Sequence, residues 1–168
     1  MDHIILIGFM GAGKTTIGKK LARRLGRGFA DTDQIVEEQE GRPISEIFAK
    51  DGEPYFRAAE TRALESLAAS PEPLVIAAGG GLAVQPANLP ILRSMGKTVY
   101  LTAGTDTLLM RLSSDTKRPL LQGGDLRKKI EGLKAAREGA YLAAADFSVA
   151  TDRRSYRSIL DEIVEKCQ

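Results

Sequence analysis

Short apolar runs alternate along this chain with longer segments in which apolar residues recur at helical spacing. Five runs have the length and composition of β-strands, and they cover residues 3–7, 29–30, 74–78, 98–101 and 147–150. The run 74–78 is apolar at each position, which is typical of a strand buried on both faces of a sheet. Because strands that alternate with helices form parallel sheets, the pattern predicts an α/β fold with a five-stranded parallel sheet flanked by helices.

The helical segments carry their apolar residues three or four positions apart. In the segment 14–25, Ile17, Leu21 and Leu25 share one face, and lysines and arginines occupy the other. The same spacing predicts a last helix over about residues 155–166.

Two further segments read as inserts between the expected elements. Residues 41–67 are expected to form several short helices between the second and third strands. Residues 113–125 hold Lys117, Arg118 and a pair of glycines, with little apolar periodicity. A polar loop with hinges and two cations is typical of a lid that closes over phosphates, and the alternative is an ordinary surface loop.

Composition narrows the class of protein. At 168 residues the chain fits one domain, and 24 lysines and arginines against 22 acidic residues give a net charge of +2. So small a charge predicts binding to neither nucleic acid nor an anionic membrane, and no apolar run approaches the ~20 residues that span a bilayer. The first strand follows Met1 so closely that we expect no signal peptide. Cys167 is the single cysteine, so we expect a cytoplasmic protein without an internal disulfide.

The segment behind the first strand carries the strongest chemical signal. Residues 8–16 read GFMGAGKTT, a complete G-x-x-x-x-G-K-S/T phosphate loop. In such a loop, backbone N–H groups and a helix N-terminus surround an anion, Lys14 reaches the β- and γ-phosphates, and the Thr15 hydroxyl binds Mg²⁺. The alternative is a glycine-rich turn without a ligand. We therefore expect a nucleoside triphosphate site formed by Gly11, Ala12, Gly13, Lys14, Thr15 and Thr16.

Acidic residues and glycines follow the next two strands. Asp31 and Asp33 come after the second strand, and Gly79, Gly80 and Gly81 come after the third. Ligands of open α/β sheets gather beyond the carboxyl ends of the strands, so we expect both groups beside the phosphate loop. One carboxylate suits the water shell of Mg²⁺ and the other a proton acceptor, and glycines let the backbone approach a ligand. The alternatives are helix N-capping by an aspartate and a tight turn at the glycines.

Two arginines complete the set of candidate residues. The guanidinium groups of Arg57 and Arg137 could each bind a carboxylate or a phosphate through two N–H groups. Either arginine taken alone could instead be a solvated helix residue.

The order of these motifs resembles the shikimate kinase family. Besides the phosphate loop, the aspartates and the three glycines, the chain contains G-R-x-I-S-x-I-F at 41–48, G-E-x-x-F-R-x-x-E at 52–60, R-P-L-L at 118–121 and R-x-x-x-Y at 137–141. The resemblance covers about residues 3–154. It implies transfer of the γ-phosphoryl group of ATP to the 3-hydroxyl of shikimate, in aromatic amino-acid biosynthesis.

The resemblance also implies an architecture. The fold is expected to be the three-layer P-loop kinase fold of the nucleoside-monophosphate-kinase type, formed by a single domain over residues 1–168. A shikimate-binding subdomain is expected over about residues 33–67 and a lid over about 113–125. The enzyme is expected to act as a monomer, with ATP and shikimate as its partners and Mg²⁺ as its cofactor.

Carried over residue by residue, the resemblance implies roles at the acceptor. Asp33 is expected to bind two ring hydroxyls of shikimate and to act as the catalytic base. Arg57 and Arg137 are expected to bind its carboxylate, with Glu60 orienting Arg57. The acceptor contacts are completed by the backbone at Gly79, Gly80 and Gly81 and by the rings of Phe48 and Phe56.

The resemblance implies a further set of roles at the nucleotide. Thr15 is expected to bind Mg²⁺ and Asp31 to hold its water shell, while Lys14 and Arg118 act on the phosphates as catalytic cations. Arg111 and Arg154 are expected near the adenine, with Tyr156.

The chain departs from the family pattern in two places. Residues 138–140 read EGA where a proline–leucine pair often precedes the tyrosine, and Gly139 makes a kink or an early end of that helix easier. Ala77 and Ala78 lack the hydroxyl that many relatives carry before the three glycines.

Two other functions fit parts of the pattern. Another small-metabolite kinase, such as a gluconate kinase, would also need a carboxylate clamp, and the joint presence of the 56–57 pair and the three glycines favours shikimate over it. A nucleotide-dependent switch is the second alternative, but the sequence contains no N-K-x-D guanine-binding motif.

Overall fold

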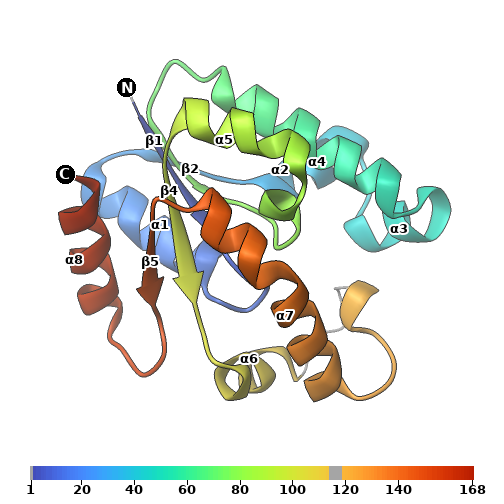
Figure 1. Cartoon of the computed structure of the whole chain (residues 1–168). Coiled ribbons are helices and arrows are strands. Elements are labelled where there is room, and N and C mark those ends of the chain that lie inside the picture. Colours follow the sequence, from blue (N-terminus) through green and yellow to red (C-terminus); the bar gives the residue numbers. More distant parts are fainter. Residues whose placement is uncertain (1, 114–118) are drawn as a thin grey trace.

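The computed structural model describes residues 2–113 and 119–168. Its centre is a five-stranded parallel sheet with the strand order β2-β3-β1-β4-β5 (Figure 1). The strands are β1 His3–Ile7, β2 Gly28–Asp31, β3 Leu74–Ala77, β4 Gly96–Thr102 and β5 Phe147–Ala150. All four neighbouring pairs run parallel, which confirms the α/β fold predicted from the alternating pattern.

Helices cover both faces of this sheet. The α-helices of the described residues are α1 Lys14–Leu25, α2 Thr32–Glu40, α3 Ile44–Asp51, α4 Glu53–Ala68, α5 Leu89–Met95, α6 Thr105–Leu112, α7 Leu126–Ala144 and α8 Tyr156–Cys167. Three short 3₁₀ turns complete the described elements: η1 Leu82–Val84, η2 Pro86–Asn88 and η3 Pro119–Leu121. No helix of the described ranges has the length and apolar character needed to cross a membrane.

Alternate residues of β1 supply the two halves of the core. Ile4 and Leu6 pack with α1 and α8 on one face, and Ile5 and Ile7 pack with α4, α5 and α7 on the other. Successive side chains of a strand point to opposite faces, so a strand that is buried on both faces needs an unbroken apolar run. Figure 1 shows the resulting three layers, with α1 and α8 on one side of the sheet and α5 and α7 on the other.

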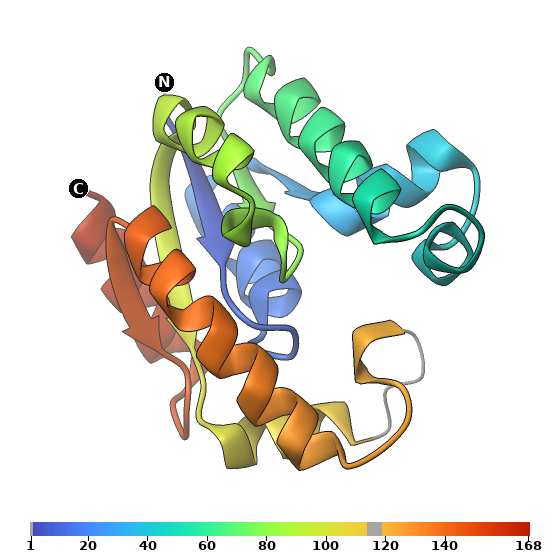
Figure 2. The ribbon, with the colours of Figure 1, turned by 45° about the vertical axis from the view of Figure 1, so that its right-hand side comes forward.

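The insert after β2 differs from the prediction of several short helices. It contains α3, and then α4 as one continuous helix of 16 residues. Gly52, with φ of +85°, ends α3, and Pro54 occupies the first turn of α4, where a missing N–H costs nothing. In both ribbon views α3 and η3 lie on the same side of the molecule (Figures 1 and 2).

Helix α7 continues through the Glu138-Gly139-Ala140 departure without a break. It spans 19 residues and ends at Ala144. The early end that Gly139 makes easier therefore does not occur, and Arg137 and Tyr141 stay one turn apart on the same buried face.

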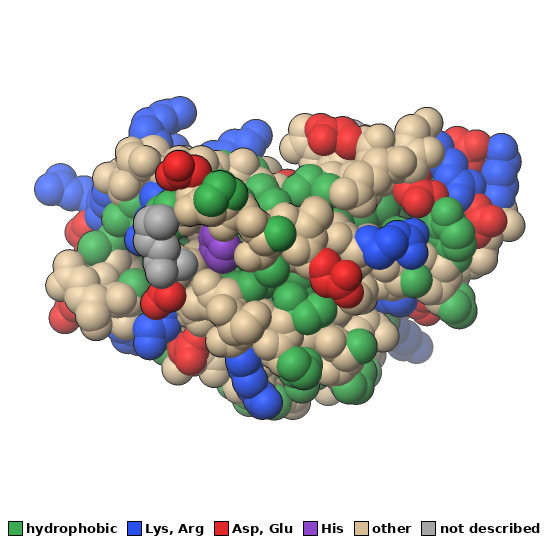
Figure 3. Space-filling model, turned by 90° about the horizontal axis from the view of Figure 1, so that it is seen from above, with side chains coloured by type: hydrophobic (Ala, Val, Ile, Leu, Met, Phe, Trp, Pro, Cys, Tyr) green, Lys and Arg blue, Asp and Glu red, His purple; other side chains and the backbone are tan. Residues whose placement is uncertain are grey.

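The surface carries charges of both signs. On the face seen in Figure 3, lysine and arginine side chains are interspersed with aspartate and glutamate and with apolar groups.

Candidate active site

The phosphate loop joins β1 to α1, as predicted. Gly8, Gly11 and Gly13 have φ of +147°, +83° and +94°, the region where glycine is favoured. At Gly8 there is also no space for a side chain, because an added Cβ would lie 2.5 Å from the carbonyl oxygen of Leu101 in β4. Gly13 is the left-handed residue from which α1 begins, so the loop leads directly into a helix N-terminus.

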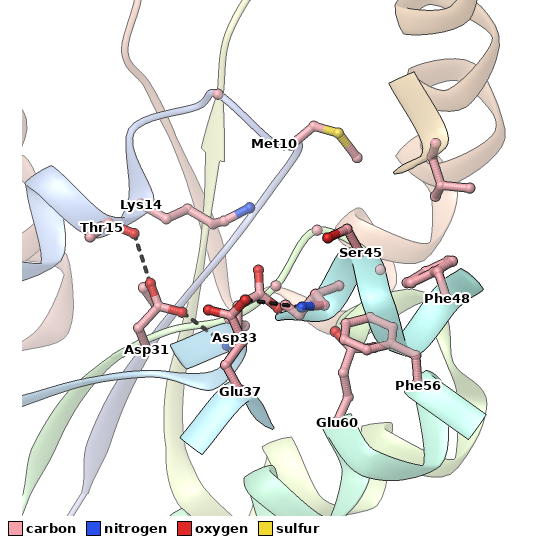
Figure 4. A pocket seen from close by; sticks show the side chains of 18 of the residues that line it. Met10, Lys14, Thr15, Asp31, Asp33, Glu37, Ser45, Phe48, Phe56 and Glu60 are labelled. Atoms are coloured by element: carbon pink, nitrogen blue, oxygen red, sulfur yellow. Dashed lines mark hydrogen bonds between the residues drawn. The ribbon is translucent and has the colours of Figure 1, made fainter. Parts of the chain in front are cut away.

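The two polar side chains at the start of α1 have hydrogen-bond partners within the protein. The Lys14 ammonium donates to the carbonyl oxygens of Gly8, at 2.5 Å, and of Phe9, at 3.3 Å, and so lies over the loop. The Thr15 hydroxyl donates to a carboxylate oxygen of Asp31 at 2.9 Å (Figure 4). The start of α1 is therefore tied to the end of β2 by a hydroxyl and a carboxylate.

Asp31 also caps the next helix. Its other carboxylate oxygen accepts from the backbone N–H of Asp33 at 2.9 Å and of Gln34 at 3.4 Å, at the N-terminus of α2. The capping alternative therefore holds for Asp31 alongside its contact with Thr15. Asp33 lies inside the first turn of α2, two residues beyond the strand end, and lines the pocket.

Thr32 stands between the two aspartates and points away from solvent. It is fully buried, and its hydroxyl accepts the N–H of Gly79 at 2.9 Å. This bond fixes the acidic strand end of β2 against the glycines that follow β3, and the sequence contained no signal for it.

Each of the three glycines makes room for a charged side chain. A Cβ on Gly79 would lie 2.5 Å from Asp33 Oδ1 and 2.8 Å from Glu60 Oε2. A Cβ on Gly80 would lie 3.2 Å from Arg137 Nη1, and one on Gly81 would collide with the guanidinium of Arg57.

None of these three described glycines has a positive φ. Glycine is therefore required here for space rather than for an unusual backbone conformation. The tight turn is present as well, because the N–H of Leu82 donates to the carbonyl oxygen of Gly79 at 3.1 Å and the chain continues into η1, so the turn and the close approach of charged groups hold together.

Arg57 extends from α4 into this crowded region. Its Nη1 donates to Glu60 Oε1 at 2.7 Å and its Nη2 to Glu53 Oε2 at 2.9 Å. Only 13% of its side chain is exposed, and its buried Nε has no hydrogen-bond partner among the described residues. A buried donor without a partner is costly, so an acceptor from outside the protein would be bound favourably here.

Arg137 presents the same feature from α7. It is 6% exposed, lies 5.8 Å from the centre of the Phe9 ring, and its Nη1 has no partner within the described part of the chain. Two buried guanidinium groups with unmatched N–H groups thus lie against neighbouring glycines.

Glu60 is a buried carboxyl in the middle of these charges. It is 1% exposed, and its Oε2 has no partner among residues 2–113 and 119–168. Burial raises the pKa of Glu60 from 4.5 to about 7, against the opposing attraction of Arg57.

These residues line one cavity of about 590 Å³. Figure 4 shows Lys14, Thr15 and Asp31 at one side, Phe48 and Phe56 at the other, and Asp33 between them. The two rings pack 5.0 Å apart, centre to centre, and form an apolar wall. The cavity therefore joins a phosphate-binding end to an apolar, arginine-bearing end. Lining residues that the sequence analysis did not select as candidates are Met10, Glu37, Pro43, Ile44, Ser45 and Leu120.

Glu37 is the clearest of these missed residues. Its carboxylate accepts the N–H of Ile44 at 2.9 Å and so caps α3 from α2, because the N-cap residue Pro43 has no side chain that can do so. An acidic residue seven positions before a helix start is a weak signal in a sequence, since the chain must first turn back.

Two described candidates, Arg111 and Arg154, do not line the cavity. Arg111 donates to the carbonyl oxygen of Gly11 at 2.9 Å, on the outer side of the phosphate loop. Arg154 donates to the carbonyl oxygen of Ala150 at 2.9 Å and pairs with Glu162 of α8 at 2.7 Å. Arg118, with Lys117 and the neighbouring positions of the expected lid, lies outside the described residues.

Comparison with known proteins identifies the family. The family model described as "Shikimate kinase" matches residues 10–168. A shikimate kinase of Moorella thermoacetica is 45% identical over 97% of this chain and 92% of its own, and one of Symbiobacterium thermophilum is 42% identical over 99% and 96%. The solved structure of a shikimate kinase from Acinetobacter baumannii in complex with shikimate is 37% identical, with a TM-score of 0.94, over 99% of this chain and 92% of that one. This chain belongs to the shikimate kinase family.

Proposed function

We propose that the cavity described above carries the shikimate kinase activity of this chain. ATP binds at the phosphate loop, shikimate binds at the arginine-bearing end, and the γ-phosphoryl group passes between them to the 3-hydroxyl. The observation that supports this arrangement most directly is a pair of buried N–H groups, Nε of Arg57 and Nη1 of Arg137, that have no hydrogen-bond partner among the residues that the structure describes. The relative from Acinetobacter baumannii was solved in complex with shikimate.

The arginine-bearing end fits the acceptor. Shikimate is a six-membered ring with one carboxylate and several hydroxyl groups. Arg57 and Arg137 bind the carboxylate through charge-assisted hydrogen bonds, and Glu60 holds Arg57 in place at 2.7 Å. The backbone at Gly79, Gly80 and Gly81 contacts the ring, and Phe48 and Phe56 form its apolar wall.

Asp33 acts as the catalytic base. Its carboxylate accepts hydrogen bonds from ring hydroxyls of shikimate and takes the proton of the attacking 3-hydroxyl. It can do so because it lies between the phosphate-binding end and the apolar wall. Phosphoryl transfer depends mainly on positioning and on neutralising charge, so a single well-placed carboxylate is sufficient for the proton.

The nucleotide end fits Mg-ATP. The loop residues Gly11 to Thr16 bind the phosphates, and Lys14 leaves the carbonyl oxygens of Gly8 and Phe9 to reach them. The Thr15 hydroxyl and the Asp31 carboxylate, 2.9 Å apart, are the oxygen ligands that Mg²⁺ prefers.

Within the described ranges no cluster of three or more acidic, histidine or cysteine side chains could hold a metal alone. Phosphate and water oxygens would therefore complete the shell of the ion, which supplies positive charge at the phosphates. Arg118 reaches the phosphates from the lid at about 113–125, and Arg111 and Arg154 lie on the adenine side.

The remaining assignments complete the proposal. Residues of about 33–67 form the shikimate-binding subdomain of a single kinase domain. The enzyme acts as a monomer in the cytoplasm, where thiols such as that of Cys167 stay reduced.

An acceptor comparison tests the proposed function. ADP release is measured with Mg-ATP and, separately, shikimate, quinate, gluconate and nucleoside monophosphates. We expect rapid turnover with shikimate alone, and weak binding of a shikimate analogue that lacks the carboxylate. Lys14→Met is the control for the nucleotide end, since it removes charge stabilisation of the transition state with little effect on packing. Equal binding of shikimate and the analogue would contradict the arginine clamp.

A further inference from the structure

A buried hydrogen-bonded bridge joins α4 to the segment that follows the three glycines. The Thr61 hydroxyl donates to Asn88 Oδ1 at 2.8 Å, and Asn88 Nδ2 donates to the carbonyl oxygen of Leu82 at 2.9 Å. Asn88 has no exposed surface. Its amide therefore uses one donor and one acceptor to connect two elements that are far apart in the sequence.

Both ends of the bridge adjoin residues of the acceptor site. Thr61 follows Glu60 directly, and its hydroxyl lies 3.2 Å from the carbonyl oxygen of Arg57, one turn earlier in α4. Leu82 follows Gly81, the glycine that lies against the Arg57 guanidinium. The bridge thus spans the same two segments that meet at the arginine.

The glycine segment needs such a restraint. Three glycines lose more conformational freedom on folding than any other three residues, and without side chains they provide few packing contacts of their own. If α4 and the glycine segment moved apart, the buried amide of Asn88 would lose its hydrogen bonds without gaining contact with water, and this costs about as much free energy as a lost hydrogen bond. The bridge therefore favours one separation between α4 and the glycines.

We propose that Asn88 and Thr61 are positioning residues for acceptor binding. They hold the backbone of α4 at the distance from the glycine segment at which Arg57 and Glu60 fit over Gly79 and Gly81. Neither residue lines the cavity, so they act through Arg57 and Glu60 and not on substrate. The inference rests on the proposed function, because it assigns the acceptor to that end of the cavity.

A matched pair of substitutions at Thr61 tests the proposal. Thr61→Val keeps the shape and removes the donor, whereas Thr61→Ser keeps the hydroxyl. We expect Thr61→Val to raise the KM for shikimate about three- to tenfold, which is the factor that ~1 kcal/mol of lost hydrogen bonding gives. The KM for Mg-ATP should stay within twofold, and Thr61→Ser should restore the shikimate KM to near the wild-type value.

A stability control separates positioning from folding. Ile163→Val removes one methylene from the core beneath α8, on the other face of the sheet, and should lower the melting temperature without changing either KM. Asn88→Asp is the second probe, because it keeps the acceptor for Thr61 but places an oxygen against the Leu82 carbonyl, and it should raise the shikimate KM at least as much as Thr61→Val.

The outcomes of this experiment are distinct. An unchanged shikimate KM in Thr61→Val, or equal rises for shikimate and Mg-ATP, would overturn the positioning role. So would a rise in Ile163→Val as large as that in Thr61→Val. Absence of shikimate turnover in the wild-type enzyme would instead contradict the proposed function.

Discussion

Replacing Glu60 with glutamine tests whether burial keeps this carboxyl protonated near neutrality. The side chain is 1% exposed, and within the described part of the chain only one of its two oxygens has a partner, the Arg57 guanidinium at 2.7 Å. Burial raises the pKa of Glu60 to about 7 from 4.5, and nearby Asp33 adds to the rise, while Arg57 and Arg137 oppose it. Glutamine has nearly the same shape and cannot ionise.

The sign of the effect follows from where the proton is held. Between pH 4.5 and 7 the native state keeps the proton on Glu60 and the unfolded chain has released it, so the free energy of unfolding falls as the pH rises. Below pH 4.5 both states are protonated, and above pH 7 both are ionised. A difference of 2.5 pKa units, from 7 minus 4.5, corresponds to about 3 kcal/mol at 1.36 kcal/mol per unit.

Urea unfolding of the substrate-free enzyme between pH 4.5 and 8 measures this difference. As the pH rises from 4.5 to 8, the free energy of unfolding of Glu60→Gln should increase by about 3 kcal/mol relative to that of wild type. The reason is that wild type loses the stability associated with the proton on Glu60, whereas glutamine has no proton to lose. Glu53→Gln is the matched control. It removes the other carboxylate partner of Arg57. The side chain of Glu53 is 47% exposed, and an ion pair at such an exposed position contributes less than ~1 kcal/mol to the free energy of unfolding. Parallel stability profiles for wild type and Glu60→Gln would refute the reasoning.

Three further predictions follow from other contacts. Asp33→Asn should lower kcat at least ~100-fold, the usual contribution of a general base; a rise in the shikimate KM alone would assign Asp33 to binding. Gly81→Ala should raise the shikimate KM at least tenfold with little effect on Mg-ATP, because its Cβ would displace a guanidinium, whereas Gly132→Ala, in open space on α7, should change neither KM. Burial lowers the pKa of His3, whose Nδ1 accepts the Leu74 N–H at 3.0 Å. As the pH falls below 6.5, His3 of the unfolded chain therefore binds a proton before His3 of the native state does. The urea midpoint of unfolding should fall more steeply below pH 6.5 in wild type than in His3→Asn, whose side-chain oxygen can still accept the Leu74 N–H. Identical slopes would contradict this account.

Local patterns made much of the fold predictable. Short, mostly apolar runs predicted the strands, and the β1–loop–α1 unit was predicted from a motif whose glycines, lysine and threonine lie within nine residues of the sequence. The phosphate loop, Asp33 and the three glycines line one cavity because the carboxyl ends of parallel strands share one edge, whereas Arg57 and Arg137 reach it from helices α4 and α7. That rule needs only the order of the elements.

Helix α4 shows where a local pattern misleads. Its buried stripe runs through Phe56, Glu60 and Leu64, each four residues apart, and the charged residue in the middle breaks the apolar periodicity. The segment therefore read as several short helices. A charged residue at a core position of an otherwise regular stripe is itself a signal of a functional site, and it could have identified Glu60 without a family resemblance.

Long-range polar contacts were beyond the sequence. The bond from Gly79 to Thr32 and the bridge from Thr61 to Asn88 join residues 47 and 27 positions apart, and each depends on how elements pack. Threonine recurs along the chain, and asparagine, which occurs once at position 88, is a residue type that is mostly exposed in proteins, so neither residue type indicated burial. Burial distinguishes them, and burial is a property of the fold.

The acceptor end of the cavity brings together charges that would not otherwise approach one another. Asp33 comes from α2, Arg57 and Glu60 from α4, and Arg137 from α7, so three separate helices must direct ionisable groups at one segment of backbone. Any side chain on that segment would displace at least one of these charged side chains. The three glycines therefore set how closely these charged groups approach one another. Burial at this place raises the pKa of Glu60, against the opposing attraction of the two arginines, and leaves an N–H group of each arginine without a partner among the described residues. A carboxylate entering between those arginines would satisfy groups that the protein alone leaves without partners among its described residues, so we expect the site to favour an anionic acceptor.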